Sequence, residues 1–248
     1  MMKKVFLFLI IPLIFLSGCI SYPPEEKPTP NFSSNTTNET INVTTIMPNN
    51  VSTTPEPTPV VKKPVLNLTA SMIKENIRWR ELPIHVYIEK TGSYNCDLQR
   101  DEILEAIRIW ESETVVSFKL TDNKSCTNCV YVKCFTETEA NVTISGEYIY
   151  KTLGEAHPVY YQLDDFYLID SGYIGVYRTS VKCIRPIKYI HEFGHMLGLA
   201  HSENENNVMH QYEECDQVIT NEIKYTLEQL YSEFVDDYVE YLYNKKFS

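Results

Sequence analysis

The chain has 248 residues, which is enough for one compact domain with a full core beside other segments. Its formal net charge is -11, and the loss of Lys3 and Lys4 with a leader would make it -13, with no basic cluster in the remainder. A chain with this charge is not expected to bind nucleic acid.

Residues 1–18 have the features of an export signal. Two lysines give a positive start, and an apolar run of twelve residues from Val5 to Leu16 follows, which is short for a membrane span. The sequence Leu16-Ser17-Gly18-Cys19 resembles the lipobox of prokaryotic lipoproteins, in which the chain is cut before the cysteine and the cysteine carries lipid. This resemblance implies a chain anchored through Cys19 on the extracellular side of the cell membrane. The alternative is an uncleaved signal anchor that spans the membrane.

Residues 19–65 are rich in Pro, Thr, Ser and Asn and have almost no apolar periodicity. Because such a segment buries too little apolar surface to fold, we expect a disordered stalk that holds the rest of the chain off the membrane. Asn-x-Ser/Thr sequons, the glycosylation acceptors of exported chains, occur in the stalk and beyond it. They are Asn31, Asn35, Asn38, Asn42, Asn50, Asn67, Asn123 and Asn141. Lipobox and sequons together indicate an archaeal or bacterial surface glycoprotein.

Residues 66–248 have the patterns of a single α+β domain. Alternating apolar residues indicate strands, and Ile103, Ile107 and Trp110 form the apolar stripe of a helix. The expected order is strand 83–89, helix 101–111, strands 115–120 and 130–135, strand-like pieces at 142–150, 158–161 and 173–177, a helix starting at Arg185-Pro186, and a last helix or helix pair at 220–243. Proline suits the first position of a helix.

The sequence HEFGHMLGLAH, residues 191–201, has the spacing of a zinc site. His191 and His195 are four residues apart, so both lie on one helix face and can reach one metal ion. Gly198 can adopt the left-handed conformation that ends a helix, which brings His201 back as a third ligand. Glu192 lies on the adjacent helix surface, where it can act as a general base on a water molecule at the metal.

The pattern HExxHxxGxxH resembles the zinc signature of the metzincin metallopeptidases. Met209, within Asn207-Val208-Met209, follows at the interval of the matrixin Met-turn, and Ser202 after the third histidine is also matrixin-like. The resemblance implies the metzincin (zincin-like) fold, with a twisted mixed β-sheet, long helices, a zinc helix and a Met-turn. It further implies a zinc endopeptidase that acts on protein or peptide substrates. Residues 154–158 resemble the edge strand that lines the matrixin substrate cleft, where a peptide binds as an added antiparallel strand.

Other interpretations remain open at this stage. In gluzincins the third zinc ligand is a glutamate, and Glu213 and Glu214 are at about the right distance. A catalytically inert zinc-containing surface module for binding or adhesion is a further alternative, although such a module has no need of a base at Glu192. The pattern also allows a zinc hydrolase that acts on something other than peptides. No Pro-Arg-Cys-Gly segment precedes the domain, so latency through a thiolate on zinc is not supported.

Two further features concern cysteines and carboxylates. With Cys19 lipidated, six cysteines remain, an even number that suits disulfides outside the cell. Cys183 and Cys215 flank the zinc helix and Met209 and are expected to pair, whereas Cys126-x-x-Cys129 allows a disulfide, a redox pair or part of a metal site. The acidic tract at Asp164, Asp165 and Asp170 is either a calcium (Ca2+) site, as in related exported proteases, or a set of solvated carboxylates.

Overall fold

The computed structural model describes residues 20–21, 61–136, 142–145, 148–151, 153–178 and 183–248. The predicted signal peptide, the lipobox Cys19, most of the stalk, and the sequons in the stalk and at Asn141 lie outside the described residues.

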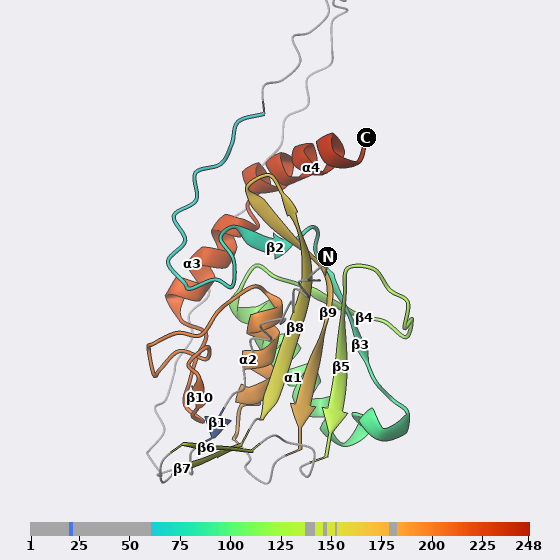
Figure 1. The fold of residues 1–248 in the computed structure, drawn as a ribbon, viewed down its shortest axis with the longest axis vertical. Coiled ribbons are helices and arrows are strands. Elements are labelled where there is room, and N and C mark those ends of the chain that lie inside the picture. Colours follow the sequence, from blue (N-terminus) through green and yellow to red (C-terminus); the bar gives the residue numbers. More distant parts are fainter. Residues whose placement is uncertain (1–19, 22–60, 137–141, 146–147, 152, 179–182) are drawn as a thin grey trace, which may run out of the picture.

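A six-stranded sheet forms the centre of the domain (Figure 1). Its strands are β2 (Ile77–Trp79), β3 (Ile84–Ile88), β4 (Phe118–Leu120), β5 (Cys129–Phe135), β8 (Gly154–Leu163) and β9 (Phe166–Tyr177). All pairings in this sheet are parallel except that of β8, which runs antiparallel to β9. In the described part of the chain β8 pairs with β9 alone, so its other edge is an edge of the sheet.

Four α-helices accompany the sheet among the described residues. They are α1 (Arg100–Glu113), α2 (Ile187–Met196), α3 (Asn221–Leu230) and α4 (Glu233–Phe247). Helix α2 packs against α1 on one side and against β8 and β9 on the other (Figure 1). The short elements are 3-10 turns η1 (Gly92–Tyr94) and η2 (Asp97–Gln99), and strands β1 (Ile20–Ser21), β6 (Val142–Ser145), β7 (Tyr148–Lys151) and β10 (Tyr212–Glu213).

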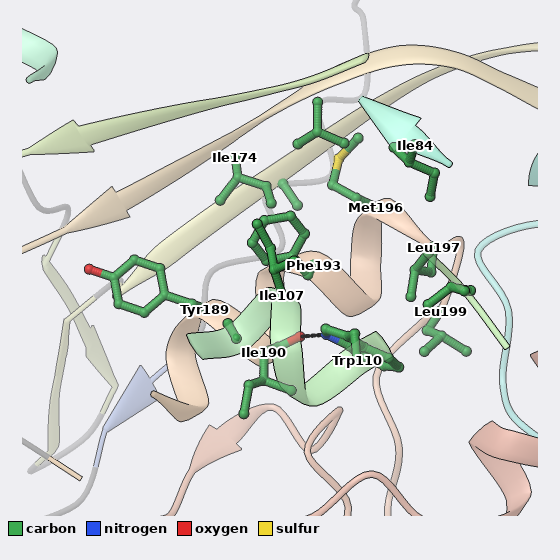
Figure 2. Packing of buried hydrophobic residues seen from close by; sticks show 14 of the residues in the cluster. Ile84, Ile107, Trp110, Ile174, Tyr189, Ile190, Phe193, Met196, Leu197 and Leu199 are labelled. Atoms are coloured by element: carbon green, nitrogen blue, oxygen red, sulfur yellow. Dashed lines mark hydrogen bonds between the residues drawn. The ribbon is translucent and has the colours of Figure 1, made fainter. Parts of the chain in front are cut away.

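The main hydrophobic core lies between the sheet and helices α1 and α2 (Figure 2). Ile174 from the sheet, Ile107 from α1 and Phe193 from α2 meet there, all nearly or fully buried. Two buried indole groups fix the position of α2. Trp110 Nε1 donates to the Ile190 carbonyl at 3.0 Å, and Trp79 Nε1 donates to the Met196 carbonyl at 2.7 Å. The core therefore holds both ends of α2 by hydrogen bonds as well as by packing.

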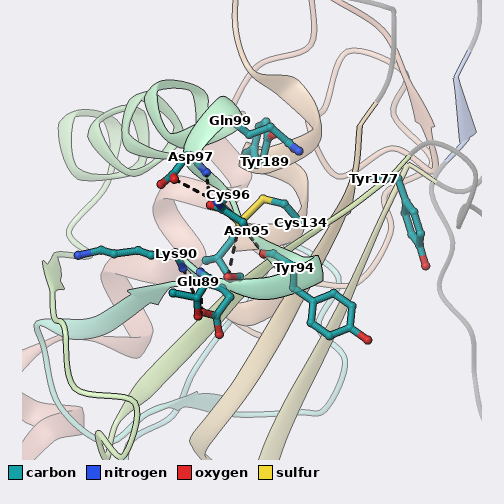
Figure 3. The surroundings of a disulfide bond; sticks show 12 residues. Glu89, Lys90, Tyr94, Asn95, Cys96, Asp97, Gln99, Cys134, Tyr177 and Tyr189 are labelled. Atoms are coloured by element: carbon teal, nitrogen blue, oxygen red, sulfur yellow. Dashed lines mark hydrogen bonds between the residues drawn. A yellow bond between two sulfur atoms is a disulfide. The ribbon is translucent and has the colours of Figure 1, made fainter.

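A disulfide between Cys96 and Cys134 joins the loop before α1 to β5 (Figure 3). Cys96 is fully buried, and its backbone N–H donates to the Glu89 carbonyl at 2.8 Å. This bond attaches the start of α1 to the sheet.

The structure confirms most of the predicted elements, and the differences have physical reasons. The stretch 142–150 contains two strands, β6 and β7, that pair antiparallel to each other. The strand-like pieces at 158–161 and 173–177 belong to β8 and β9, which are much longer and continue through polar and aromatic residues. Pro186 caps α2 instead of being its first helical residue, and the last helix is a pair interrupted at 231–232.

Strand β2 was not predicted. Its three residues, Ile77, Arg78 and Trp79, are all buried, and the middle one is charged, so no alternation indicates a strand. The Arg78 guanidinium is satisfied by the Leu230 carbonyl and by Asp236. Among the described residues, none of the helices has both the length and the apolar character required to cross a membrane.

Candidate metal centre

Helix α2 carries polar side chains into the core. All of its residues are buried except Lys188, and the buried set includes His191, Glu192 and His195. Ionisable side chains are seldom found fully buried unless they have partners or a function. The position of these three residues therefore identifies α2 as the centre of a candidate site.

Two backbone carbonyls orient the histidines of α2. His191 Nδ1 lies 2.7 Å from the Val208 carbonyl oxygen, and His195 Nδ1 lies 2.8 Å from the Leu199 carbonyl oxygen. Because a carbonyl oxygen only accepts, each Nδ1 carries the proton and each Nε2 presents a lone pair. The two Nε2 atoms are 2.9 Å apart, so the lone pairs converge on one point.

The chain turns at Gly198 and brings His201 to the same point. Gly198 has φ of +90°, which confirms the expected left-handed residue after the end of α2. The ring centroid of His201 lies 5.3 Å from that of His191 and 4.8 Å from that of His195. One ligand atom from each of the three imidazoles lies within 4.8 Å of the other two.

Burial keeps these imidazoles neutral. It lowers the pKa of His195 to about 4, and it lowers the pKa of His191 well below its usual range, with His195 and His201 adding to the effect. The pKa of His201 is also lowered, mainly by burial. Neutral imidazole is the form that binds a metal ion, and three such nitrogens, two of them oriented by backbone carbonyls, are a donor set that fits zinc.

A comparison with protein-family models matches residues 78–232 to the matrixin model. The chain belongs to the matrixin family. This family consists of zinc metalloproteases with the metzincin fold, and the α+β architecture and the three-histidine cluster agree with that membership. A search of curated proteins finds no match for this matrixin.

Glu192 of this matrixin is 1% exposed, and its side chain packs against Gly154, the first residue of β8. Met209, also 1% exposed, lies in a turn that several hydrogen bonds fix. Its N–H donates to Asn207 Oδ1 at 2.8 Å, and its carbonyl accepts from the Ser202 N–H at 2.9 Å. The same turn supplies the Val208 carbonyl that orients His191, so the turn and the histidines form one connected unit.

The structure also bears on two alternatives from the sequence, a glutamate as the third zinc ligand and a calcium site at the acidic tract. Among the described residues, the group able to hold a metal contains His201 and neither Glu213 nor Glu214, which removes support from a glutamate as third ligand. In the acidic tract, Asp164 pairs with Lys245 and Asp165 pairs with Lys63. A calcium ion at these carboxylates stays a prediction.

One of the three disulfides among the described residues flanks the site. Cys183 pairs with Cys215, as expected, and so joins the segment before α2 to the segment after Met209. Cys126 and Cys129 pair with each other, which makes neither of them a metal ligand in this structure. The carbonyls of Val208 and Leu199, which orient the two histidines of α2, could not be predicted from the sequence, because every residue has a backbone carbonyl.

Proposed function

We propose that this matrixin is a zinc-dependent endopeptidase that hydrolyses protein or peptide substrates outside the cell. The observation that carries the proposal is the convergence of three neutral imidazoles, two of them buried on α2, with the buried carboxylate of Glu192 on that helix. A binding module that kept zinc only for structure would not require the carboxylate.

His191, His195 and His201 would hold the zinc ion, the first two through Nε2. When bound, zinc supplies Lewis-acid chemistry that acidifies a water molecule and polarises the scissile carbonyl. The second shell is already in place, since the Val208 and Leu199 carbonyls fix the tautomers of the first two ligands.

Glu192 would act as the general base. Its carboxylate accepts the proton of the attacking water and passes it to the leaving amine as the peptide bond breaks. Met209 shapes the floor of the site without binding the metal. The edge of β8 that has no strand partner among the described residues, at 154–158, would receive the substrate as an added antiparallel strand.

The proposed location rests on the N-terminal residues and the cysteines. Lipid on Cys19 would anchor the chain on the extracellular side of the membrane, with 19–65 as the stalk. Three disulfides among the described residues support an oxidising compartment. Asn67 and Asn123 are exposed, as glycosylation requires. Mass spectrometry tests the anchor, because an intact Met1 or an unmodified Cys19 would rule out lipidation.

The test of the activity is hydrolysis of an unfolded protein such as casein by the purified chain, with zinc measured on the same sample. We expect one zinc per chain and cleavage that a chelator stops. Glu192→Gln keeps the size of the side chain but removes the base, so it should retain zinc and lower kcat by about 100-fold or more.

Two outcomes would contradict the proposal. Full activity of Glu192→Gln would exclude Glu192 as the base. Stoichiometric zinc without cleavage of any peptide or protein tested would favour the inert binding or adhesion module.

A further inference from the structure

The first residue of β8 leaves no room for a side chain. A Cβ atom placed on Gly154 would lie 2.4 Å from Glu192 Oε1 and 2.7 Å from both Cδ and Cγ of the same residue. Separations below about 3 Å do not occur for real Cβ atoms, because the repulsion between the atoms is too strong. The carboxylate of Glu192 therefore fills the volume that a side chain at position 154 would occupy.

Other contacts keep the backbones of β8 and α2 from moving apart at this point. Gly154 is opposite Val176 in the antiparallel pairing of β8 with β9, and the Leu153 carbonyl beside it accepts from the Tyr177 N–H at 2.9 Å. Helix α2 is held by the indole groups of Trp110 and Trp79. A side chain at 154 must therefore displace the Glu192 side chain.

We propose that Gly154 is a positioning residue for catalysis, because the missing side chain creates the space that holds the Glu192 carboxylate in its place against β8. This inference rests on the proposed function. A methyl group at 154 turns Glu192 into another rotamer and moves the base from its place. Displacement of a reacting group by about 1 Å can lower the rate by about 100-fold.

Gly154→Ala is thus expected to lower kcat about 100-fold while KM and zinc content stay near the values of the unchanged protein. KM should be preserved because the edge of β8 remains, and zinc because the three atoms nearest the new methyl group all belong to Glu192 and not to a histidine. A purely structural role would lower the amount of folded, zinc-containing protein and leave kcat per zinc unchanged.

Gly175→Ala is the matched control. Gly175 lies in β9, one residue before the partner of Gly154, and a Cβ there would also be crowded. Its near neighbours are the side chains of Phe135 and Glu155, at 2.6 Å and 2.9 Å, and not Glu192. This variant introduces the same methyl group into the same strand pair, and it should leave kcat within about threefold of the unchanged protein.

A double-mutant cycle with Glu192→Ala tests the contact without any turnover. Gly154→Ala should lower the Tm of the metal-free protein when Glu192 is present, and by less than half as much when position 192 is alanine. If Gly154→Ala alone does not fold, the double variant should fold, because the clash is gone.

An equal loss of Tm in both backgrounds, a double variant that also fails to fold, or an unchanged kcat in Gly154→Ala would each overturn the proposal. If the unchanged protein cleaves nothing, the proposed peptidase fails by itself, and the thermal cycle still decides whether Gly154 holds the Glu192 side chain in place.

Discussion

At the scale of single residues, the same burial that makes the histidines good ligands makes the metal-free protein sensitive to acid. The pKa of His195 is about 4 in the folded chain and about 6.5 in an unfolded one. Between these values the unfolded chain binds more protons, so stability falls as pH falls through this window. The full difference between the two pKa values corresponds to a loss on the order of 3 kcal/mol in the free energy of unfolding from His195 alone.

Thermal unfolding of the chelator-treated protein at pH 7 and pH 4.5 measures this effect, and we expect a lower Tm at the acid value. Burial also raises the pKa of Glu213 to about 7. This shift has the opposite effect on the pH dependence of stability, because the stabilisation that it gives is lost as pH rises from about 4.5 to 7. Glu213→Gln removes that opposing effect and should steepen the acid loss. A flat Tm in both proteins would contradict the neutral, buried state of the histidines.

At the scale of elements, the Cys183–Cys215 disulfide joins the segment before α2 to the segment after Met209, across 32 residues of chain. A cross-link over a loop of this length stabilises a protein by about 4 kcal/mol in the chain-entropy model, whereas the three-residue separation of Cys126 and Cys129 gives only about 2 kcal/mol. Replacing Cys183 and Cys215 by serine should therefore lower the free energy of unfolding more than replacing Cys126 and Cys129.

Chemical denaturation of the two double-serine variants measures the free energies of unfolding. The Cys183/Cys215 variant should also bind zinc more weakly, because the disulfide restrains the segment that contains Val208 and Met209. The Cys126/Cys129 variant is the control and should keep the zinc affinity of the unchanged protein. Equal losses of stability in the two variants would contradict the argument from loop length.

Elements with a single clear period were predictable from the sequence. The stripe of Ile103, Ile107 and Trp110 predicted α1. The spacing of His191 and His195 predicted α2, and the glycine at 198 predicted the turn after it. The unpredicted element, β2, has a charged residue buried between two apolar ones. Arg78 takes partners from α3 and α4, far along the chain, as well as from the neighbouring carbonyls of Trp79 and Arg80. Such a strand has no local signal.

In the site too, the sequence predicted what lies within one local segment and not what depends on contacts between distant segments. A fixed motif within eleven residues brought together the three histidines and Glu192, because one helix and one turn place them. The contact between Gly154 and Glu192 joins residues 38 positions apart, and it depends on where β8 crosses α2. Tertiary packing sets that crossing, so the motif could not show it.

At the scale of the whole molecule, the fold extends beyond the residues that match the family model. Residues 66–74 precede the match and lie between α3 and the loop that carries His201. The backbone N–H of Ala70 donates to Thr226 Oγ1 at 2.9 Å. The Ile73 N–H donates to the Gly198 carbonyl at 2.8 Å, and the Ala200 N–H donates to the Ser71 carbonyl at 3.0 Å.

Residues 66–248 should therefore fold with nearly the Tm of the full chain and bind zinc equally well. This chain loses the two-residue pairing of β1 with β10 and the ion pair of Lys63 with Asp165. The lysine is exposed, so the ion pair contributes at most about 1 kcal/mol. Residues 75–248 retain β2 but lose the hydrogen bonds to the Gly198–Ala200 turn. This shorter chain should have a lower Tm and at least about tenfold weaker zinc binding, since His201 follows the turn directly. Equal zinc affinity of the two chains would show that α2 and the Met209 turn alone position the third histidine.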